Sequence, residues 1–297
     1  MNRLTAADFS PEVLRAFDSY VHGDLDRRGF IEQAGRLGSC AAGAVALLAA
    51  LSPDFAAAQQ VRANDPRIAT RTQAFDSPQG NGQVRGLLAG PAQGAVAGRL
   101  PVVLVVHENR GLNPHIEDIA RRLAVDGFIA YAPDALAPLG GYPGDEDKAR
   151  ELFGKLDADK TRADFLAATK ALMVLPDGNR RVGAVGFCFG GGMVNYLATQ
   201  VPELAAAVPF YGGQPPAADV ARIKAPLLIH YAGQDERINA GWPPFEAALK
   251  AAGIRYEAHI YPNVQHGFNN DTTPRFDADA ARLAWQRTIA FFKARLV

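Results

Sequence analysis

The feature that most constrains the fold is a cysteine held between glycines where two different segments join. Residues 181–185 (RVGAV) are typical of a buried strand, residues 186–192 read GFCFGGG, and residues 193–198 (MVNYLA) are typical of a helix. A sharp strand-to-helix turn leaves no room for a Cβ two positions before or after its apex, so glycine is required there. The motif therefore predicts a nucleophile elbow with Cys188 at its apex. A glycine-rich loop around a buried, inert thiol is the alternative.

An acid and a histidine follow this turn in the chain order that it predicts. Asp235 comes just after residues 226–231 (PLLIHY), an apolar run typical of a buried strand, and His266 lies on the loop after the next strand-like segment. An imidazole can take a proton from a thiol, and a carboxylate behind the imidazole fixes its tautomer. The order nucleophile, acid, histidine predicts a triad of Cys188, Asp235 and His266. A helix N-cap is the alternative role for Asp235.

A charged cluster follows the most strand-like run of the chain. The run is residues 100–106 (LPVVLVV), and the cluster at residues 107–111 reads HENRG. In a site built on this kind of turn, the developing oxyanion accepts hydrogen bonds from two backbone N–H groups. We expect one from Phe189, the residue after the nucleophile, and the other from the loop that holds the cluster.

Four motifs together (H-E-x-x-G, G-x-C-x-G-G, G-x-D and H-G-F) make residues 70–297 resemble the dienelactone hydrolase family of carboxymethylenebutenolidase-like enzymes. The resemblance implies an α/β-hydrolase fold, and hydrolysis of small esters or lactones through a cysteine acyl-enzyme without a cofactor. It also implies that Glu108 contacts the resting thiol and modulates its ionisation, and that the N–H of Asn109 is the second oxyanion donor. Two alternatives are a non-catalytic, exported small-molecule-binding protein on the same scaffold and a thiol redox protein.

The resemblance is incomplete where the substrate would bind. Dienelactone hydrolases carry an arginine shortly after the His-x-Phe segment, and an arginine and a tyrosine on a helix that would correspond to residues 146–153. The present sequence does not reproduce them. Arg110, Tyr142 and Arg237 are the candidates to contact a substrate in their place.

The first 58 residues are predicted to be a twin-arginine export leader. Residues 27–31 read RRGFI, residues 41–51 form an uncharged apolar run of signal-peptide length, and residues 56–58 supply an A-x-A cleavage pattern. The mature chain would then begin near Gln59, be exported by the twin-arginine machinery, and lie in the periplasm or outside the cell.

A folded N-terminal helical arm on a cytoplasmic protein is the alternative for the same segment. Ser10 and Pro11 are typical of the start of a helix, and Gly23 is typical of its end. Five apolar residues between them share one helical face. They are Val13, Leu14, Phe17, Tyr20 and Val21.

Composition and alternation define the rest of the chain. A formal net charge of +0 over 297 residues argues against a nucleic-acid partner, and residues 41–51 are too few to span a bilayer.

Strand-like and helix-like segments alternate through residues 59–297, which predicts one α/β domain with a mostly parallel sheet covered on both faces. The chain has 2 cysteines, and removal of a leader containing Cys40 would leave Cys188 without a disulfide partner. The spacings C-x-x-C and H-E-x-x-H do not occur, so no metal is expected.

Overall fold

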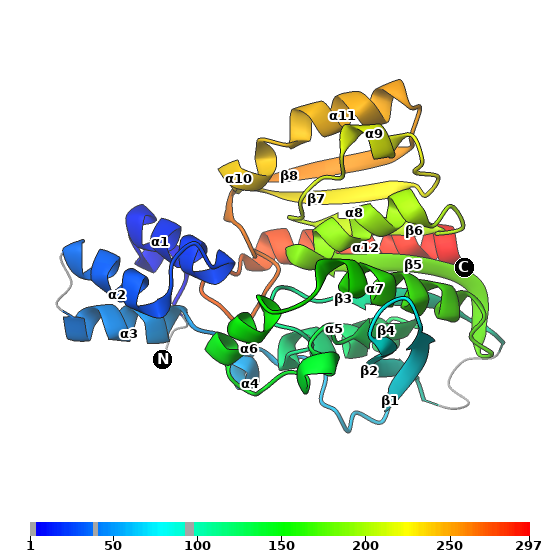
Figure 1. Cartoon of the computed structure of the whole chain (residues 1–297), viewed down its shortest axis with the longest axis horizontal. Coiled ribbons are helices and arrows are strands. Elements are labelled where there is room, and N and C mark those ends of the chain that lie inside the picture. The colour runs from blue at the N-terminus through cyan, green and yellow to red at the C-terminus, as the bar shows by residue number, and fades with distance from the viewer. Residues whose placement is uncertain (1–3, 38–40, 93–97) are drawn as a thin grey trace.

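The structure, a computed structural model, describes residues 4–37, 41–92 and 98–297. Within these residues one eight-stranded sheet forms the centre of the molecule (Figure 1). In spatial order its strands are β1 (Ile68–Ser77), β2 (Gly82–Pro91), β4 (Ile129–Pro133), β3 (Leu100–Val106), β5 (Gly178–Phe187), β6 (Ala206–Phe210), β7 (Leu227–Gln234) and β8 (Tyr256–Gln265). Strand β2 is antiparallel to both neighbours, and all other neighbouring pairs are parallel. The predicted mostly parallel sheet is confirmed.

Helices fill the connections between strands and the N-terminal segment. They are α1 (Pro11–His22), α2 (Arg27–Arg36), α3 (Ala41–Leu51), α4 (Phe55–Ala58), α5 (Pro114–Val125), α6 (Glu146–Phe153), α7 (Ala158–Met173), α8 (Phe189–Gln200), α9 (Ala217–Val220), α10 (Glu236–Asn239), α11 (Trp242–Ala251) and α12 (Ala278–Leu296), with short 3₁₀ turns at η1 (Ala6–Asp8) and η2 (Ala137–Leu139).

The sheet is buried on both faces, as its strand sequences predict. Along β3, Val103 and Val105 point to one face and pack in a core with α5 and α12. Leu104 and Val106 point to the other face and pack in a core with α7, α8 and α11. This alternation follows from the period of two residues in a strand. It explains why a parallel strand reads as a continuous apolar run.

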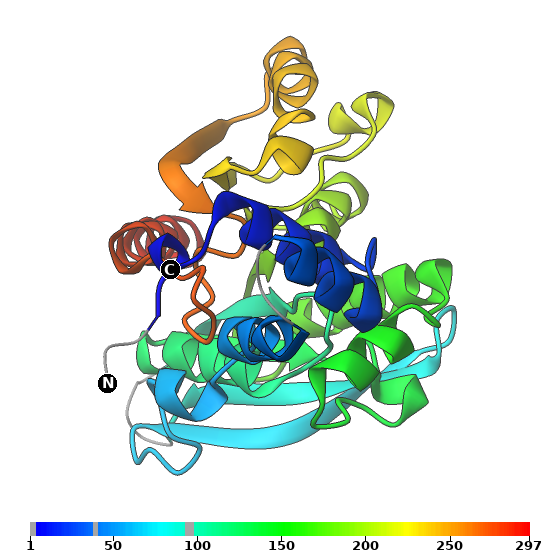
Figure 2. The ribbon, with the colours of Figure 1, turned by 90° about the vertical axis from the view of Figure 1, so that its left-hand side faces the viewer.

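The N-terminal helices have an apolar core of their own. Helix α1 begins as its sequence predicts, because the side-chain oxygen of Ser10 accepts a hydrogen bond from the N–H of Val13, and Gly23 ends the helix with φ of 90°. Its apolar face packs against α2 and α3 around Phe30, which is fully buried. Figures 1 and 2 show α1, α2 and α3 beside the loops that follow the strands. Export of this segment as a leader stays a prediction, and Cys40 lies outside the described residues.

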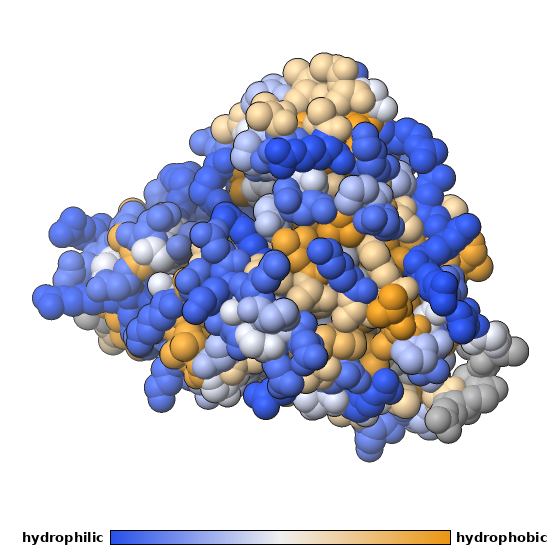
Figure 3. Space-filling view, turned by 45° about the vertical axis from the view of Figure 1, so that its right-hand side comes forward, coloured by the Kyte–Doolittle hydropathy of each residue, from blue (hydrophilic) through white to orange (hydrophobic). Residues whose placement is uncertain are grey.

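The surface is mixed in character. The face in Figure 3 is mostly hydrophilic, and apolar side chains gather near its middle. Among the described residues, no helix combines the length and the hydropathy that a membrane span requires.

Candidate active site

The turn between β5 and α8 holds Cys188 in a strained conformation. Its φ is 54° and its ψ is −113°, a region that costs a residue with a side chain about 1–3 kcal/mol. A Cβ on Gly186 would lie 2.1 Å from the carbonyl oxygen of Gly190, and a Cβ on Gly190 would lie 2.2 Å from the carbonyl oxygen of Val106. The glycines on both sides of the cysteine are therefore required by contact with backbone, as the motif predicts.

Asp235 and His266 meet at the ends of neighbouring parallel strands, β7 and β8. Nδ1 of His266 lies 2.5 Å from Oδ2 of Asp235, and both residues are buried. The other carboxylate oxygen, Oδ1, accepts a hydrogen bond of 3.2 Å from the N–H of Ile238 and caps α10. The carboxylate thus performs both of the roles that the sequence left open, the histidine partner and the helix cap.

The structure brings His266 to the cysteine as well. A ring nitrogen of His266 lies within 4.8 Å of Sγ of Cys188. Nε2 of His266 is buried and has no hydrogen-bond partner among the described residues. Burial raises the pKa of the Cys188 thiol, but His266 and His22 outweigh it and lower that pKa to about 6. Burial lowers the pKa of His266, but Cys188 and Asp235 outweigh it and raise that pKa. These directions favour a thiolate beside an imidazolium.

A second histidine, absent from the sequence prediction, reaches the same thiol from α1. Nε2 of His22 lies 3.6 Å from Sγ of Cys188, and Nδ1 lies 2.8 Å from the carbonyl oxygen of Asp18 and 3.4 Å from its Oδ2. Burial lowers the pKa of His22, but Asp18 and Cys188 outweigh it and raise that pKa to about 9. Nη2 of Arg237 lies 2.8 Å from Nε2 of His22. In the sequence, only the i,i+4 spacing of Asp18 and His22 on a predicted helix indicated that these two side chains would pair.

Glu108, expected to modulate the thiol, has a different partner. Its Oε2 accepts a hydrogen bond of 2.8 Å from the side-chain amide of Asn270. In the described part of the chain, the thiol of Cys188 has its hydrogen-bond contact with His22 and not with Glu108. The role of Glu108 stays a prediction. His107 beside it is fully buried and accepts a hydrogen bond from the N–H of Ala135, which suits a structural role.

A cavity of about 520 Å³ opens at the thiol. Cys188, Phe189 and Asn109 line it together with His22 and Arg237. Because Phe189 is the first residue of α8, its N–H has no acceptor inside the helix, and its role as an oxyanion donor stays a prediction. Both predicted oxyanion donors and one predicted substrate contact, Arg237, therefore belong to residues that line the same cavity.

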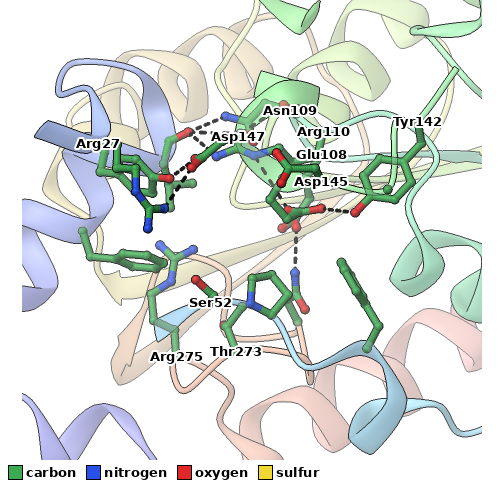
Figure 4. Close-up of a pocket in the computed structure, with 18 residues that line it drawn as sticks. Arg27, Ser52, Glu108, Asn109, Arg110, Tyr142, Asp145, Asp147, Thr273 and Arg275 are labelled. Carbon is green, nitrogen blue, oxygen red and sulfur yellow. Dashed lines mark hydrogen bonds and ion pairs between the residues drawn. The ribbon is translucent and has the colours of Figure 1, made fainter. Parts of the chain in front are cut away.

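The other two predicted substrate contacts lie in a neighbouring cavity of about 400 Å³ (Figure 4). The guanidinium of Arg110 donates a hydrogen bond of 2.7 Å to Oδ1 of Asn109 and lies 3.7 Å from Glu146. The hydroxyl of Tyr142 donates to the same Glu146 at 2.8 Å. Arg110 also donates to the carbonyl oxygen of Val21 at the end of α1. Arg110 and Tyr142 are thus engaged with protein groups, away from the thiol.

Polar contacts hold the N-terminal helices over these cavities. Nη1 of Arg150 on α6 donates to the carbonyl oxygen of Tyr20 at 2.8 Å. The hydroxyl of Tyr20 donates to Asp147. Nη1 of Arg275 lies 3.1 Å from Oδ1 of Asp18. These contacts join α1 to α6 and to the loop before α12. Helix α1 therefore connects two segments that border the cavities.

The strand order, the strained cysteine turn and the acid–histidine pair at the strand ends define a protein of the α/β-hydrolase fold. The sequence profile of the Dienelactone hydrolase family matches residues 84–296, so the chain belongs to that family and is a dienelactone hydrolase-like hydrolase. A second profile, described as YqhI-like, matches residues 1–38.

Several known proteins resemble the chain over most of its length. A putative carboxymethylenebutenolidase of Escherichia coli strain K12 is 36% identical, covering 66% of this chain and 78% of that protein. One from Saccharolobus solfataricus is 32% identical, covering 71% of this chain and 94% of that protein. The crystal structure of a putative dienelactone hydrolase from Klebsiella pneumoniae is 29% identical with a TM-score of 0.66, covering 76% of this chain and 99% of that one.

Proposed function

We propose that this hydrolase cleaves small esters or lactones through a thioester on Cys188. The observation that carries the proposal is the position of Cys188, at a strained apex beside His266, whose other nitrogen is 2.5 Å from Asp235. The names of the related putative carboxymethylenebutenolidases support the same class of substrate.

In the first half of the proposed reaction, the thiolate of Cys188 attacks the carbonyl carbon of the substrate. The carbonyl oxygen becomes an oxyanion and accepts hydrogen bonds from the N–H groups of Phe189 and Asn109. The C–O bond to the leaving group then breaks, and His266 gives its proton to the departing alkoxide. In a lactone, the new hydroxyl stays attached to the acyl group.

In the second half, water hydrolyses the thioester. His266, now neutral, takes a proton from the water that attacks the acyl carbon. The tetrahedral intermediate collapses with loss of the Cys188 thiolate, and the acid product leaves. Asp235 stays ionised throughout and holds the imidazole in the orientation that both steps need.

The choice of cysteine bears on the class of ester. A thiolate is a good nucleophile and also a good leaving group, so it returns to the free form from a tetrahedral intermediate unless the alcohol leaves easily. We propose that enol-type esters and lactones are better substrates than plain alkyl esters. Rates on an enol lactone and on an alkyl ester of matched size test this point, and faster turnover of the alkyl ester contradicts it.

The test of the central proposal compares the parent protein with Cys188→Ala and Cys188→Ser on aryl esters and lactones. We expect Cys188→Ala to lose at least about 10³-fold in kcat, because the group that forms the acyl bond is gone. Circular dichroism checks that both variants are folded. Full activity in Cys188→Ala would refute a cysteinyl mechanism, and trapping of the acyl-enzyme by mass spectrometry would support it directly.

Export stays part of the proposal for the N-terminal segment. Cleavage after residue 58 would remove His22 and α1, whereas a retained segment would keep both at the site. The intact mass of the protein from the periplasmic fraction distinguishes the two forms. A mass near the full 31.7 kDa in every fraction contradicts removal of the leader.

A further inference from the structure

Three side chains with metal-binding atoms meet at one place from three regions of the chain. They are His22 on α1, Cys188 at the turn before α8, and His266 after β8, and their ligand atoms lie within 4.8 Å of one another. Nε2 of His22 is 3.6 Å from Sγ of Cys188. A tetrahedral zinc with Zn–S of about 2.3 Å and Zn–N of about 2.0 Å separates a sulfur and a nitrogen ligand by about 3.5 Å. The spacing already suits two ligands of one ion.

Each imidazole is oriented as zinc ligands usually are. A ligating histidine donates its second N–H to a carboxylate or a backbone carbonyl, which fixes the tautomer and the ring. Nδ1 of His266 lies 2.5 Å from Oδ2 of Asp235. Nδ1 of His22 lies 2.8 Å from the carbonyl oxygen of Asp18, with Oδ2 of the same residue at 3.4 Å. Both arrangements leave Nε2 as the nitrogen available to an ion.

An independent observation points to a ligand here. Nε2 of His266 is buried, the residue is only 4% exposed, and this nitrogen has no hydrogen-bond partner within the described ranges. A buried polar atom without a partner is unfavourable by about 1–3 kcal/mol, so a group that binds it is stabilising. Nε2 lies on the ring opposite the nitrogen held by Asp235, and a ring nitrogen of His266 is within reach of the sulfur.

The donor set selects the kind of ion. One thiolate and two imidazoles, with no carboxylate ligand, suit Zn²⁺ or another soft to borderline transition metal and not Mg²⁺ or Ca²⁺. The cavity of about 520 Å³ beside Cys188 leaves room for a fourth ligand such as water. One group opposes binding, because Nη2 of Arg237 lies 2.8 Å from Nε2 of His22. Arg237 is exposed and its long side chain is able to turn into solvent.

The geometry points to a transition-metal site formed by His22, Cys188 and His266, with Zn²⁺ as the ion that fits it. Binding forms one Zn–S and two Zn–N bonds, and two protons pass to solvent, one from Nε2 of His22 and one from the Cys188–His266 pair. The sulfur of Cys188 is then a ligand of the ion, so the metal-bound protein has no free thiolate. This inference concerns metal binding by the chain that retains the N-terminal segment with His22, and it stands whether or not the protein hydrolyses esters.

The experiment titrates the full-length, chelator-treated chain with Co²⁺, whose thiolate charge-transfer and visible ligand-field bands report the ligands, and then displaces Co²⁺ with Zn²⁺. We expect one equivalent to bind with a thiolate band that Cys188→Ala abolishes. His22→Gln should weaken binding at least tenfold, and Asp18→Asn should weaken it less than His22→Gln does, because the backbone carbonyl of Asp18 still orients His22. His259→Gln, on a histidine paired with Glu257 elsewhere, is the control and should bind as the parent does.

One variant is expected to increase the affinity for Co²⁺ instead of lowering it. Arg237→Gln removes the guanidinium that contacts His22 and should tighten Co²⁺ binding by at least threefold, which general damage to the fold would not do. The absence of a thiolate band in the parent, or equal affinity in the parent and His22→Gln, would overturn the site. Ester hydrolysis by the same metal-free samples is measured separately, so a failure of the proposed function is distinguishable from a failure of the metal site.

Discussion

Two histidine–carboxylate pairs flank one thiol, and they come from regions built in different ways. His266 and Asp235 follow adjacent strands of the sheet, and their side chains are 5% and 2% exposed. His22 and Asp18 lie on α1, and their side chains are 12% and 33% exposed. The positions of Asp235 and His266 are fixed by the pairing of β7 with β8, which they directly follow. The positions of His22 and Asp18 depend on the small apolar core of α1–α3 and on the polar contacts of α1 with α6 and with the loop before α12. Proximity to the thiol is therefore not sufficient to assign a catalytic base, since the two pairs differ in burial and in the elements that position them.

The largest expected effect separates the two histidines by function. His266→Gln should lower kcat on an aryl ester by at least about 10³-fold, because the proposed base and proton donor is lost. His22→Gln should lower kcat by less than about tenfold, since the proposed reaction assigns no proton transfer to His22. Steady-state kinetics on metal-free protein measure both. Equal losses in the two variants would mean that the pair on α1 shares the catalytic work.

The turn that carries the thiol should tolerate almost no added volume. Gly186→Ala should destabilise the domain by about 3 kcal/mol, because its Cβ would lie 2.1 Å from the carbonyl oxygen of Gly190. Gly192→Ala is the matched control, since its Cβ would meet nothing closer than 3.5 Å and alanine favours a helix. Urea unfolding measures both. A similar midpoint for the two variants would contradict the steric argument.

The N-terminal helices should loosen independently of the sheet. Leu48→Ala, at a position 2% exposed, should destabilise the helical core by about 2–4 kcal/mol. Val45→Ala, on the same helix and 44% exposed, should change it by less than about 0.5 kcal/mol. Hydrogen exchange should then rise in α1–α3 in the first variant and stay unchanged in β3 and β5. Faster exchange throughout the sheet would mean that the two regions unfold as one unit.

The smallest effect is on the pH dependence of hydrolysis. The pKa of Cys188 is lowered to about 6, so kcat/KM should rise as the pH rises through about 6, where the thiolate forms. His22 is one of the groups that lower this pKa. His22→Gln should therefore move the acid limb upward by about one pH unit, which corresponds to the loss of one hydrogen bond to a charged group, about 1.4 kcal/mol. An unmoved acid limb in His22→Gln, with His259→Gln as the control, would show that His22 does not stabilise the thiolate.

The sheet and the Cys188–Asp235–His266 cluster were predictable because they depend on local patterns. A buried parallel strand such as β3 must be apolar on both faces, and the elbow needs glycine for contacts with its own neighbouring backbone. Strand β1 was not predicted because it lies at the sheet edge with mostly exposed side chains, so it has no apolar run. Its pairing with β2 determines the structure there.

The approach of His22 to the thiol was not predictable from such patterns. The two residues are 166 positions apart, and their contact depends on how α1 docks onto groups such as Arg150 and Arg275. The partner of Glu108 was missed for a similar reason, because Asn270 reaches it from the loop after β8. Sequence spacing describes one element at a time, whereas these contacts are set by the packing of several elements.

The divided carboxylate of Asp235 restricts which residues evolution can place there. One oxygen starts α10 and the other orients His266, so the side chain needs two acceptors on a stem short enough to cap a helix. Glutamate has the acceptors but a longer stem, asparagine has the stem but a single acceptor, and serine reaches the cap alone. Homologues that keep the imidazole in use should therefore show aspartate at this position, or should supply the acid from another strand and leave the cap to a neutral residue.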